Sequence, residues 1–149
     1  MAVRDTTTGA NYEGIVKYCL ERQSLLNGFT IHPQSAVGFK PTKGRHVVDW
    51  ELASLHDPNI RGLLSCKYQG VAGTAEEKIP FEIIKLLHTM KVDARYTHSW
   101  LVMGGVGWSP GMARFLHEEL EEWIPDMRGK ISICTTDQLI GANISLDNR

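Results

Sequence analysis

The sequence predicts an α/β protein with a mixed β-sheet flanked by helices, in one domain over residues 1–149. Three observations support this prediction. A chain of 149 residues suits one domain with a sizeable core. With 42% hydrophobic and 22% charged residues, the composition is that of a globular protein. Segments of helical periodicity alternate with short apolar runs, in the order helix, strand, strand, helix, strand, helix, strand.

The first half of the chain is predicted to contain one helix and two strands. Residues 1–10 are polar and expected to be loosely held, and an apolar stripe predicts a helix over Asn11–Leu26. Residues 29–44 hold two prolines and little periodicity, so we expect a loop with room for a short strand. The segments RHVVDWEL (45–52) and LLSCKYQ (63–69) predict two strands that can form a hairpin.

The second half is predicted to contain two helices and two strands. A glycine-bounded turn at 70–73 leads to a helix that ends near Lys91. Thr74-Ala75-Glu76-Glu77 resembles a capping box, while Pro80 fits only near a helix start, so a short first turn before the main helix satisfies both. The apolar stripe of that helix is Ile79, Ile83, Leu86, Leu87 and Met90. Further on, the sequence predicts a strand over Ser99–Gly105, a helix opened by Ser109 and Pro110 with the stripe Ala113, Leu116, Leu120, Trp123 and Ile124, and a strand over Lys130–Thr135.

Composition and motifs exclude several classes of protein. No apolar run approaches the ~20 residues that span a bilayer, and the N-terminus has no apolar core of a secretory signal. The three cysteines are scattered, which fits a reducing compartment, so we expect a cytoplasmic protein, or one in the host cytoplasm if phage-encoded. No phosphate-binding glycine loop is present. With a net charge of −1, any nucleic acid must bind to a local basic patch.

Two charged residues stand inside the apolar strands of the predicted hairpin. Asp49 lies in the first strand and Lys67 in the second, and a charge in such a place is costly unless it is paired or bound to a metal. One interpretation is a buried ion pair in a purely structural domain. The other is hydrolysis of a phosphodiester, in which Asp49 holds Mg²⁺ and Lys67 stabilises developing charge and positions the nucleophile. The residues alone leave both open.

The arrangement Asp49…Ser65-Cys66-Lys67 resembles the PD-(D/E)xK nuclease superfamily, whose core is a helix with a Glu, a hairpin with Asp and (D/E)xK, and a second helix. The phrases RHVVDWEL, SCKYQGVAGTAEEKIPFEI and GVGW resemble a restriction-type subgroup, and the resemblance covers about residues 11–125. It implies a restriction-endonuclease-like core and a DNA endonuclease that uses Mg²⁺, with Mn²⁺ as a substitute. Double-stranded DNA would be cut by a homodimer or higher homo-oligomer. Restriction comes first among the biological roles, then homing or phage functions, then repair.

Ser65 departs from the family pattern, because it stands where an Asp or Glu is expected. A serine hydroxyl is a poorer Mg²⁺ ligand than a carboxylate, so we expect another acid to take its place. Glu76 is the candidate, since helical spacing aligns it with the apolar stripe, although it also suits a helix N-terminus electrostatically. The alternative is an inactive DNA- or partner-binding domain that keeps the nuclease fold.

The resemblance and the strand pattern add four further candidates. Glu13, in the first helix, would bind the metal directly or through water, and the backbone carbonyl of Cys66 would bind it as well. Lys78 would contact phosphate or the active site, although its spacing aligns it with Glu82 and Lys85 on a solvated face. Gln69 shares a strand face with Lys67, so it either orients water or phosphate or is an ordinary polar residue. For contacts to bases, residues 29–44 and 135–149 are candidates by position only.

Overall fold

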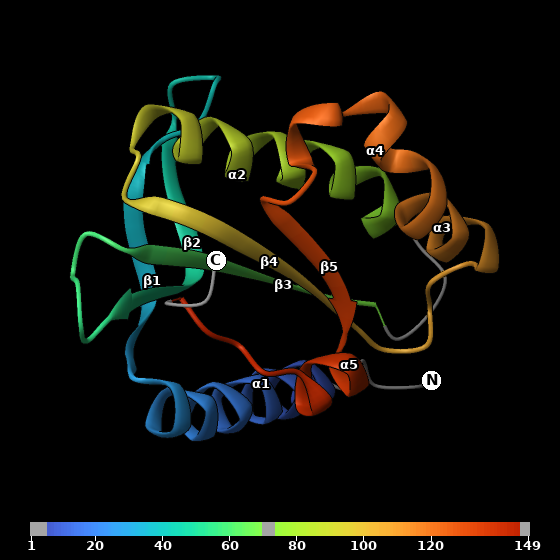
Figure 1. Ribbon diagram of the computed structural model, residues 1–149. Coiled ribbons are helices and arrows are strands. Elements are labelled where there is room, and N and C mark those ends of the chain that lie inside the picture. The colour runs from blue at the N-terminus through green and yellow to red at the C-terminus, as the bar shows by residue number, and fades with distance from the viewer. Residues whose placement is uncertain (1–5, 70–73, 147–149) are drawn as a thin grey trace.

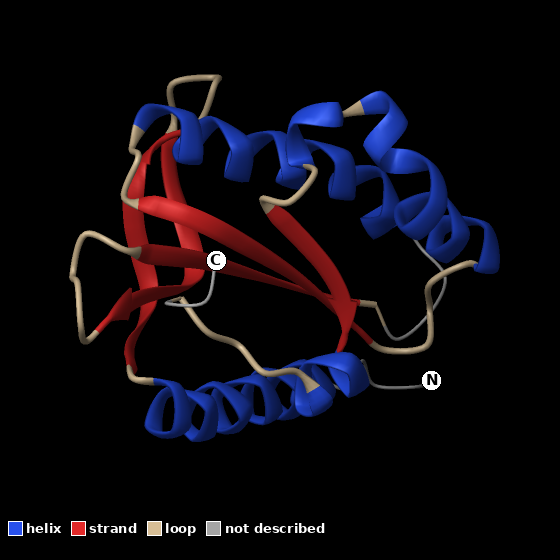
Figure 2. Cartoon of the chain, in the orientation of Figure 1, coloured by secondary structure: helices blue, strands red, loops and turns tan. Residues whose placement is uncertain are grey.

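The computed structural model describes residues 6–69 and 74–146, which form a five-stranded sheet between two layers of helices (Figures 1 and 2). The strands are β1 (Phe29–Phe39), β2 (Arg45–Ser54), β3 (Arg61–Tyr68), β4 (Tyr96–Gly104) and β5 (Ile131–Thr135). The helices are α1 (Thr6–Asn27), α2 (Ile79–Val92), α3 (Pro110–Arg114), α4 (Leu120–Trp123) and α5 (Thr136–Gly141), with 3₁₀ turns η1 (Thr74–Lys78) and η3 (Pro125–Met127) and a π-helical turn η2 (Phe115–Glu119). None of the described helices is long and apolar enough to cross a membrane.

The sheet is mixed, as the sequence predicts. Its strand order is β1-β2-β3-β4-β5, with antiparallel pairing from β1 to β3 and parallel pairing from β3 to β5. Helices α1 and α5 cover one face, and α2 with α3 and α4 covers the other (Figure 1). Val16, Leu20 and Leu64 belong to the core on the α1 side, while Leu63 and Ile83 belong to the core on the α2 side. The α/β fold with helices on both faces is therefore confirmed.

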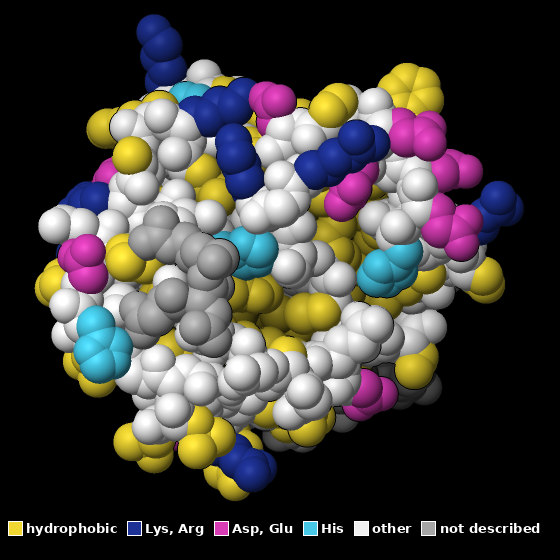
Figure 3. Space-filling model, in the orientation of Figure 1, with side chains coloured by type: hydrophobic (Ala, Val, Ile, Leu, Met, Phe, Trp, Pro, Cys, Tyr) yellow, Lys and Arg dark blue, Asp and Glu magenta, His cyan; other side chains and the backbone are white. Residues whose placement is uncertain are grey.

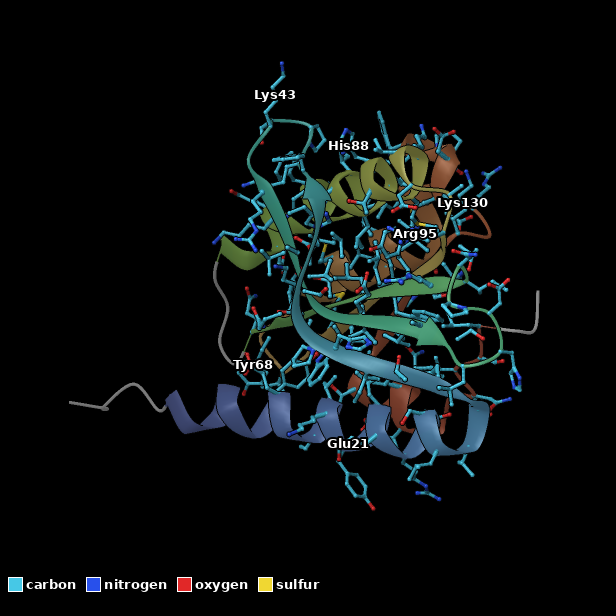
Figure 4. The ribbon with its side chains drawn as sticks, turned by 90° about the vertical axis from the view of Figure 1, so that its left-hand side faces the viewer. Glu21, Lys43, Tyr68, His88, Arg95 and Lys130 are labelled. Atoms are coloured by element: carbon cyan, nitrogen blue, oxygen red, sulfur yellow. The ribbon has the colours of Figure 1, made fainter. Side chains whose placement is uncertain are left out.

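Strands β2 and β3 separate partway along their length. Residues 50–53 of β2 pair with residues 61–64 of β3. Residues 45–48 of β2 pair only with β1 among the described strands. Residues 65–68 of β3 pair only with β4 among the described strands. Figure 4 shows the two strands diverging, with the β1–β2 hairpin bending toward α2. We call this divergence the strand fork, and it lies between Asp49 and the end of β3.

The structure corrects three expectations for the elements. Residues 29–39, expected to be mainly loop, form the edge strand β1, because they gain a hydrogen-bonded partner in β2. Helix α1 begins at Thr6, so residues 6–10 of the segment expected to be loose are helical. A short helix, α5, follows β5, and Thr135 and Gln138 make its capping box. The turn expected at 70–73 and the first five residues lie outside the described part of the chain.

The start of α2 agrees with the predicted compromise. Residues 74–78 form a 3₁₀ turn, the α-helix begins at Ile79, and Pro80 lies in its first turn. All five residues of the predicted apolar stripe are buried. In the next helical segment, however, a π-helical turn at 115–119 inserts extra residues and shifts the phase of the helix. Leu116 and Leu120 are therefore buried while Trp123, expected in the same stripe, is 76% exposed.

Gly104 ends β4 against the ring of Tyr12, whose hydroxyl donates to the Val102 carbonyl at 2.9 Å. A Cβ at Gly104 would overlap that ring. We expect Gly104→Ala to lower the free energy of unfolding by about 1–3 kcal/mol, measured by urea denaturation. Gly111→Ala is the matched control, because a Cβ there meets nothing within 4 Å and stability should not fall. Equal stability of the two variants would show that Tyr12 can move aside.

Candidate active site

Asp49 lies at the strand fork and bridges the two strands. The backbone N–H of Cys66 donates to its Oδ2 at 2.7 Å, and the Gln34 amide approaches its Oδ1 at 3.5 Å. Gln34 has a positive φ of 48°, a conformation uncommon outside glycine that concentrates at functional sites. The divergence of β2 from β3 leaves room for the carboxylate, which the hydrogen bond to Cys66 then fixes beside β3.

A pocket of about 330 Å³ brings together Asp49, Cys66 and Glu13. Lys17 also lines it, so helix α1 contributes one acid and one base to its wall. Burial raises the pKa of the Cys66 thiol, and the nearby Asp49 and Glu13 carboxylates raise it further. The thiol is therefore neutral at pH 7 and is not poised as a nucleophile. The structure thus places Glu13 beside Asp49.

Glu82, on the inward face of α2, contacts β3 from the other side of the sheet. Its Oε1 accepts a hydrogen bond from the Ser65 hydroxyl at 2.7 Å, and its Oε2 lies 3.5 Å from the Lys67 ammonium. Lys85, one turn further along α2, pairs with the same Oε2 at 2.7 Å. Glu82 is only 5% exposed. A carboxylate therefore does stand next to Ser65, but it comes from α2 and not from residue 76.

The Glu82 carboxylate is held in its charged form. Burial alone would raise its pKa, but the hydrogen bonds from Lys85 and Ser65 and the charge of Lys67 outweigh burial, so the pKa lies below its ordinary value. His46, buried on β2, is also close enough to feel this charge. Burial lowers the pKa of His46 and the Glu82 carboxylate opposes that effect, with a net lowering, so His46 is neutral at pH 7.

Glu76 and Lys78 occupy other surroundings. The Glu76 carboxylate accepts hydrogen bonds from the backbone N–H of Ser109 at 2.6 Å and from its hydroxyl at 3.1 Å. It therefore joins η1 to the start of α3, where Ser109 is the N-cap. The helical alignment expected for Glu76 does not arise, because residues 74–78 are a 3₁₀ turn with a different period. Lys78 is exposed just before α2.

Gln69 connects β3 to the loop after β4. Its Nε2 donates to the Gly107 carbonyl at 2.7 Å, and the Gly107 N–H donates back to the Gln69 carbonyl at 2.7 Å. The side chain is buried, and its Oε1 has no hydrogen-bond partner among the described residues. These bonds hold the GVGW loop beside the end of β3. Gln69 therefore has a structural role through its backbone and its side-chain N–H, while its side-chain oxygen accepts no hydrogen bond from the described residues.

The ion pair considered for the hairpin takes a different form. Within residues 6–69 and 74–146, Lys67 pairs with Glu82, and Asp49 accepts from Cys66 and Gln34, with no Asp49–Lys67 pair. Two carboxylates from different elements thus reach the three consecutive residues Ser65–Lys67. The spacing of Glu82 predicts a place on a solvated face, whereas the structure buries its carboxylate against Ser65 and Lys67. Its spacing from Ile79 and Leu86, three and four residues away, was the available signal, because such residues share a helix face.

Oxygen atoms reach Ser65–Lys67 from both faces of the sheet, with Asp49 on the α1 side and Glu82 on the α2 side. Asp49, Glu82 and the backbone carbonyl of Cys66 offer only oxygen atoms, which Mg²⁺ prefers, and Mg²⁺ usually keeps several waters. Among the described residues, no group of three or more His, Cys, Asp and Glu side chains could hold a metal ion. The chain would therefore supply a small set of oxygen ligands and leave the remaining positions to water and substrate.

Comparison with known proteins gives a match to the part of the chain that contains the strand fork and α2. A family model described as a PD-(D/E)XK nuclease superfamily domain matches residues 44–143, which include the hairpin, α2 and β5. Neither the curated proteins nor the solved structures gave a match. The family match spans about two thirds of the chain and contains Asp49, Ser65, Lys67 and Glu82. The chain belongs to the PD-(D/E)XK nuclease superfamily.

Proposed function

We propose that this protein is an Mg²⁺-dependent DNA endonuclease that hydrolyses phosphodiester bonds in double-stranded DNA. One observation carries the proposal: two carboxylates contact the segment Ser65–Lys67 at the strand fork. Asp49 accepts from the Cys66 N–H, and Glu82 contacts the Ser65 hydroxyl and the Lys67 ammonium. Membership of the nuclease superfamily supports it. The residues include an acid from each of two elements and a cation, a set that metal-assisted hydrolysis of a phosphodiester can use.

The residues at the fork have separate roles in this proposal. Asp49 and Glu82, with the Cys66 carbonyl, would hold Mg²⁺, which would supply polarisation of the phosphate and a lowered pKa of water. Glu82 takes the place that the sequence analysis gave to Glu76. Lys67, whose side chain is 30% exposed, stabilises negative charge that develops on the phosphate. Glu13 faces the pocket beside Asp49 and supports the site through water.

Cutting both strands of a symmetric site requires two copies of the active site, so the proposal includes a homodimer or higher homo-oligomer. Restriction is the leading biological role, ahead of homing or phage functions and repair, because the GVGW loop and the segment from Ser65 to Ile83 resemble restriction-type nucleases. Both resembling segments lie close to the candidate site. The GVGW loop is hydrogen-bonded to Gln69 at the end of β3, and the segment from Ser65 to Ile83 contains Glu82.

A cleavage assay with supercoiled plasmid tests the proposal. We expect nicked and linear products with Mg²⁺ or Mn²⁺ and none with EDTA, because the described site has oxygen ligands for a cation but no activated Ser or Cys nucleophile. Product is measured by gel densitometry against time. Asp49→Asn protein, purified by the same procedure, is the control for contaminating nuclease.

Two results would contradict the proposal. Cleavage that continues in EDTA would exclude the metal-dependent mechanism. Folded protein that binds DNA but leaves it intact with both metals would favour the inactive binding domain. The position of Glu82 argues against that alternative, since the absence of an acid at Ser65 was its basis.

A further inference from the structure

The outer half of the β1–β2 hairpin stands apart from the rest of the sheet. Beyond the fork, residues 45–48 of β2 pair with residues 35–39 of β1 and not with β3, so these segments form a two-stranded ribbon. A two-stranded ribbon is one of the few elements that fits the major groove of DNA. In Figure 1 the turn of this hairpin rises above α2, near the C-terminal end of that helix.

One face of the ribbon packs on α2, and the other is exposed. His46 and Val48 are buried, and His46 Nδ1 lies 2.7 Å from the hydroxyl of Thr89 on α2. Arg45 and Val47 alternate with them and are exposed, Val47 to 46%. Since residues two apart share a strand face, Asp49 continues the same row toward the fork. The exposed face of the ribbon therefore ends at a candidate catalytic residue.

The exposed face combines cations with an apolar ring. Phe39, 65% exposed, is the cross-strand partner of Arg45. Exposed Lys43 occupies the turn, where Figure 4 shows it projecting away from the body of the protein. From residue 35 to residue 48 the chain contains no Asp or Glu. None of the ion pairs found among the described residues includes Lys40, Lys43 or Arg45.

The turn that presents these side chains is held by its backbone. The N–H of Lys40 donates to the Gly44 carbonyl at 2.7 Å, and the N–H of Lys43 donates to the Lys40 carbonyl at 2.8 Å. Lys43 has a positive φ of 72°, which turns the chain at the tip. A ribbon that is already ordered loses less conformational entropy on binding than a flexible loop.

Charge and distance both suit a DNA duplex. In Figure 3, Lys and Arg side chains lie over α2 and at the tip of the hairpin, while acidic side chains gather over η2 and α4, which contain Glu118, Glu119, Glu121 and Glu122. Asp49 is four positions after Arg45, which is about 13 Å along a strand. The major groove is about 12 Å wide. The ribbon can thus occupy a groove while Asp49 stands at the adjoining phosphate.

We propose that the exposed face of the β1–β2 ribbon enters the major groove of duplex DNA next to the scissile phosphate, with Arg45 contacting base edges and Lys43 contacting a phosphate. This inference rests on the proposed nuclease function and adds the element that reads the sequence. Phe39 and Val47 give the ribbon apolar contacts for thymine methyl groups, which are exposed in the major groove.

Binding measured without cleavage tests the ribbon. Fluorescence anisotropy in EDTA, with a labelled 20-base-pair duplex of random sequence, gives the affinity over a salt series. We expect Lys43→Ala to weaken binding to all sequences and to reduce the salt slope by about one. Lys130→Ala is the matched control, an exposed lysine that Figure 4 shows on a different side of the molecule. Its affinity and slope should equal those of the wild type.

Sequence reading is tested by selecting bound duplexes from a randomised pool and sequencing them. We expect a preferred sequence for the wild type and loss of preference at one or two positions for Arg45→Ala, with affinity for the selected site about tenfold lower. An RNA duplex should bind more weakly, because its major groove is too narrow for side chains to read.

The outcomes separate this inference from the nuclease proposal. Wild-type affinity, slope and preference in both ribbon variants would overturn the ribbon assignment, as would absence of any preference in the wild type or equal affinity for duplex RNA. Thermal unfolding at the wild-type temperature confirms that each variant is folded. None of these readouts depends on cleavage, so a protein that binds through the ribbon but fails to cut would refute only the catalytic proposal.

Discussion

Asp49→Asn should reduce plasmid cleavage by more than about a hundredfold, while the fold and the binding of DNA in EDTA remain those of the wild type. Loss of an outer residue that merely supports a metal ligand already costs 10–100-fold, so loss of a direct ligand should cost at least as much. The amide is isosteric with the carboxylate and its oxygen can still accept from the Cys66 N–H, which keeps the fork intact. Cleavage rates across a Mg²⁺ titration measure the effect.

Asp57→Asn is the matched control for this prediction. It makes the same chemical change on an exposed side chain in the turn at the other end of the β2–β3 hairpin, where Asp57 accepts from the Asn59 N–H at 3.0 Å. Its cleavage rate should equal that of the wild type. If Asp49→Asn cleaves at the wild-type rate in saturating Mg²⁺, the carboxylate at the fork has no catalytic role.

Glu82→Gln should have the second large effect, a loss of cleavage of similar size, and Glu76→Gln should change the rate only a few-fold. Glu82 bears the negative charge next to Ser65 and Lys67, and the amide removes that charge while it can still accept from the Ser65 hydroxyl. Because the folded protein lowers the pKa of Glu82, the wild-type side chain is charged at neutral pH. Glu76, by contrast, serves the start of α3 through Ser109.

Ser65→Ala completes the comparison, because it removes the hydroxyl that orients Glu82 and keeps the charge. One lost hydrogen bond costs about 1 kcal/mol, so this variant should be milder than Glu82→Gln. Circular dichroism and thermal unfolding establish that each variant is folded before rates are compared. If Glu76→Gln lost cleavage while Glu82→Gln kept it, Glu76 and not Glu82 would be the catalytic acid. The ion pairs of Glu82 would then be structural.

The strand hairpin and the apolar stripe of α2 could be predicted because both depend on local sequence. Alternation of apolar residues defines a strand, and recurrence every three or four residues defines a helix face, whatever surrounds them. β1 could not be predicted in this way, since Pro33 and Gly38 interrupt its pattern. It is a strand because β2 lies beside it and takes up its hydrogen bonds, which is a contact between segments.

Trp123 shows a second limit of periodicity. Its spacing from Leu116 and Leu120 is correct for a regular α-helix, but the π-helical turn at 115–119 changes the number of residues per turn. A change of period in the middle of a helix arises from packing around it. The pattern of apolar residues then no longer identifies the buried face.

Local sequence patterns were enough to predict the mixed α/β fold, the family resemblance that the family match confirms, and the positions of Asp49 and Lys67 on neighbouring strands. Which acid stands next to Ser65 depended on how the elements pack. Glu76 and Glu82 are six residues apart, and the choice between them depends on where the 3₁₀ turn gives way to α-helix and on how α2 packs over β3. A carboxylate that serves a site from another element is placed by that packing, because its distance from the site along the chain says nothing about its distance in space.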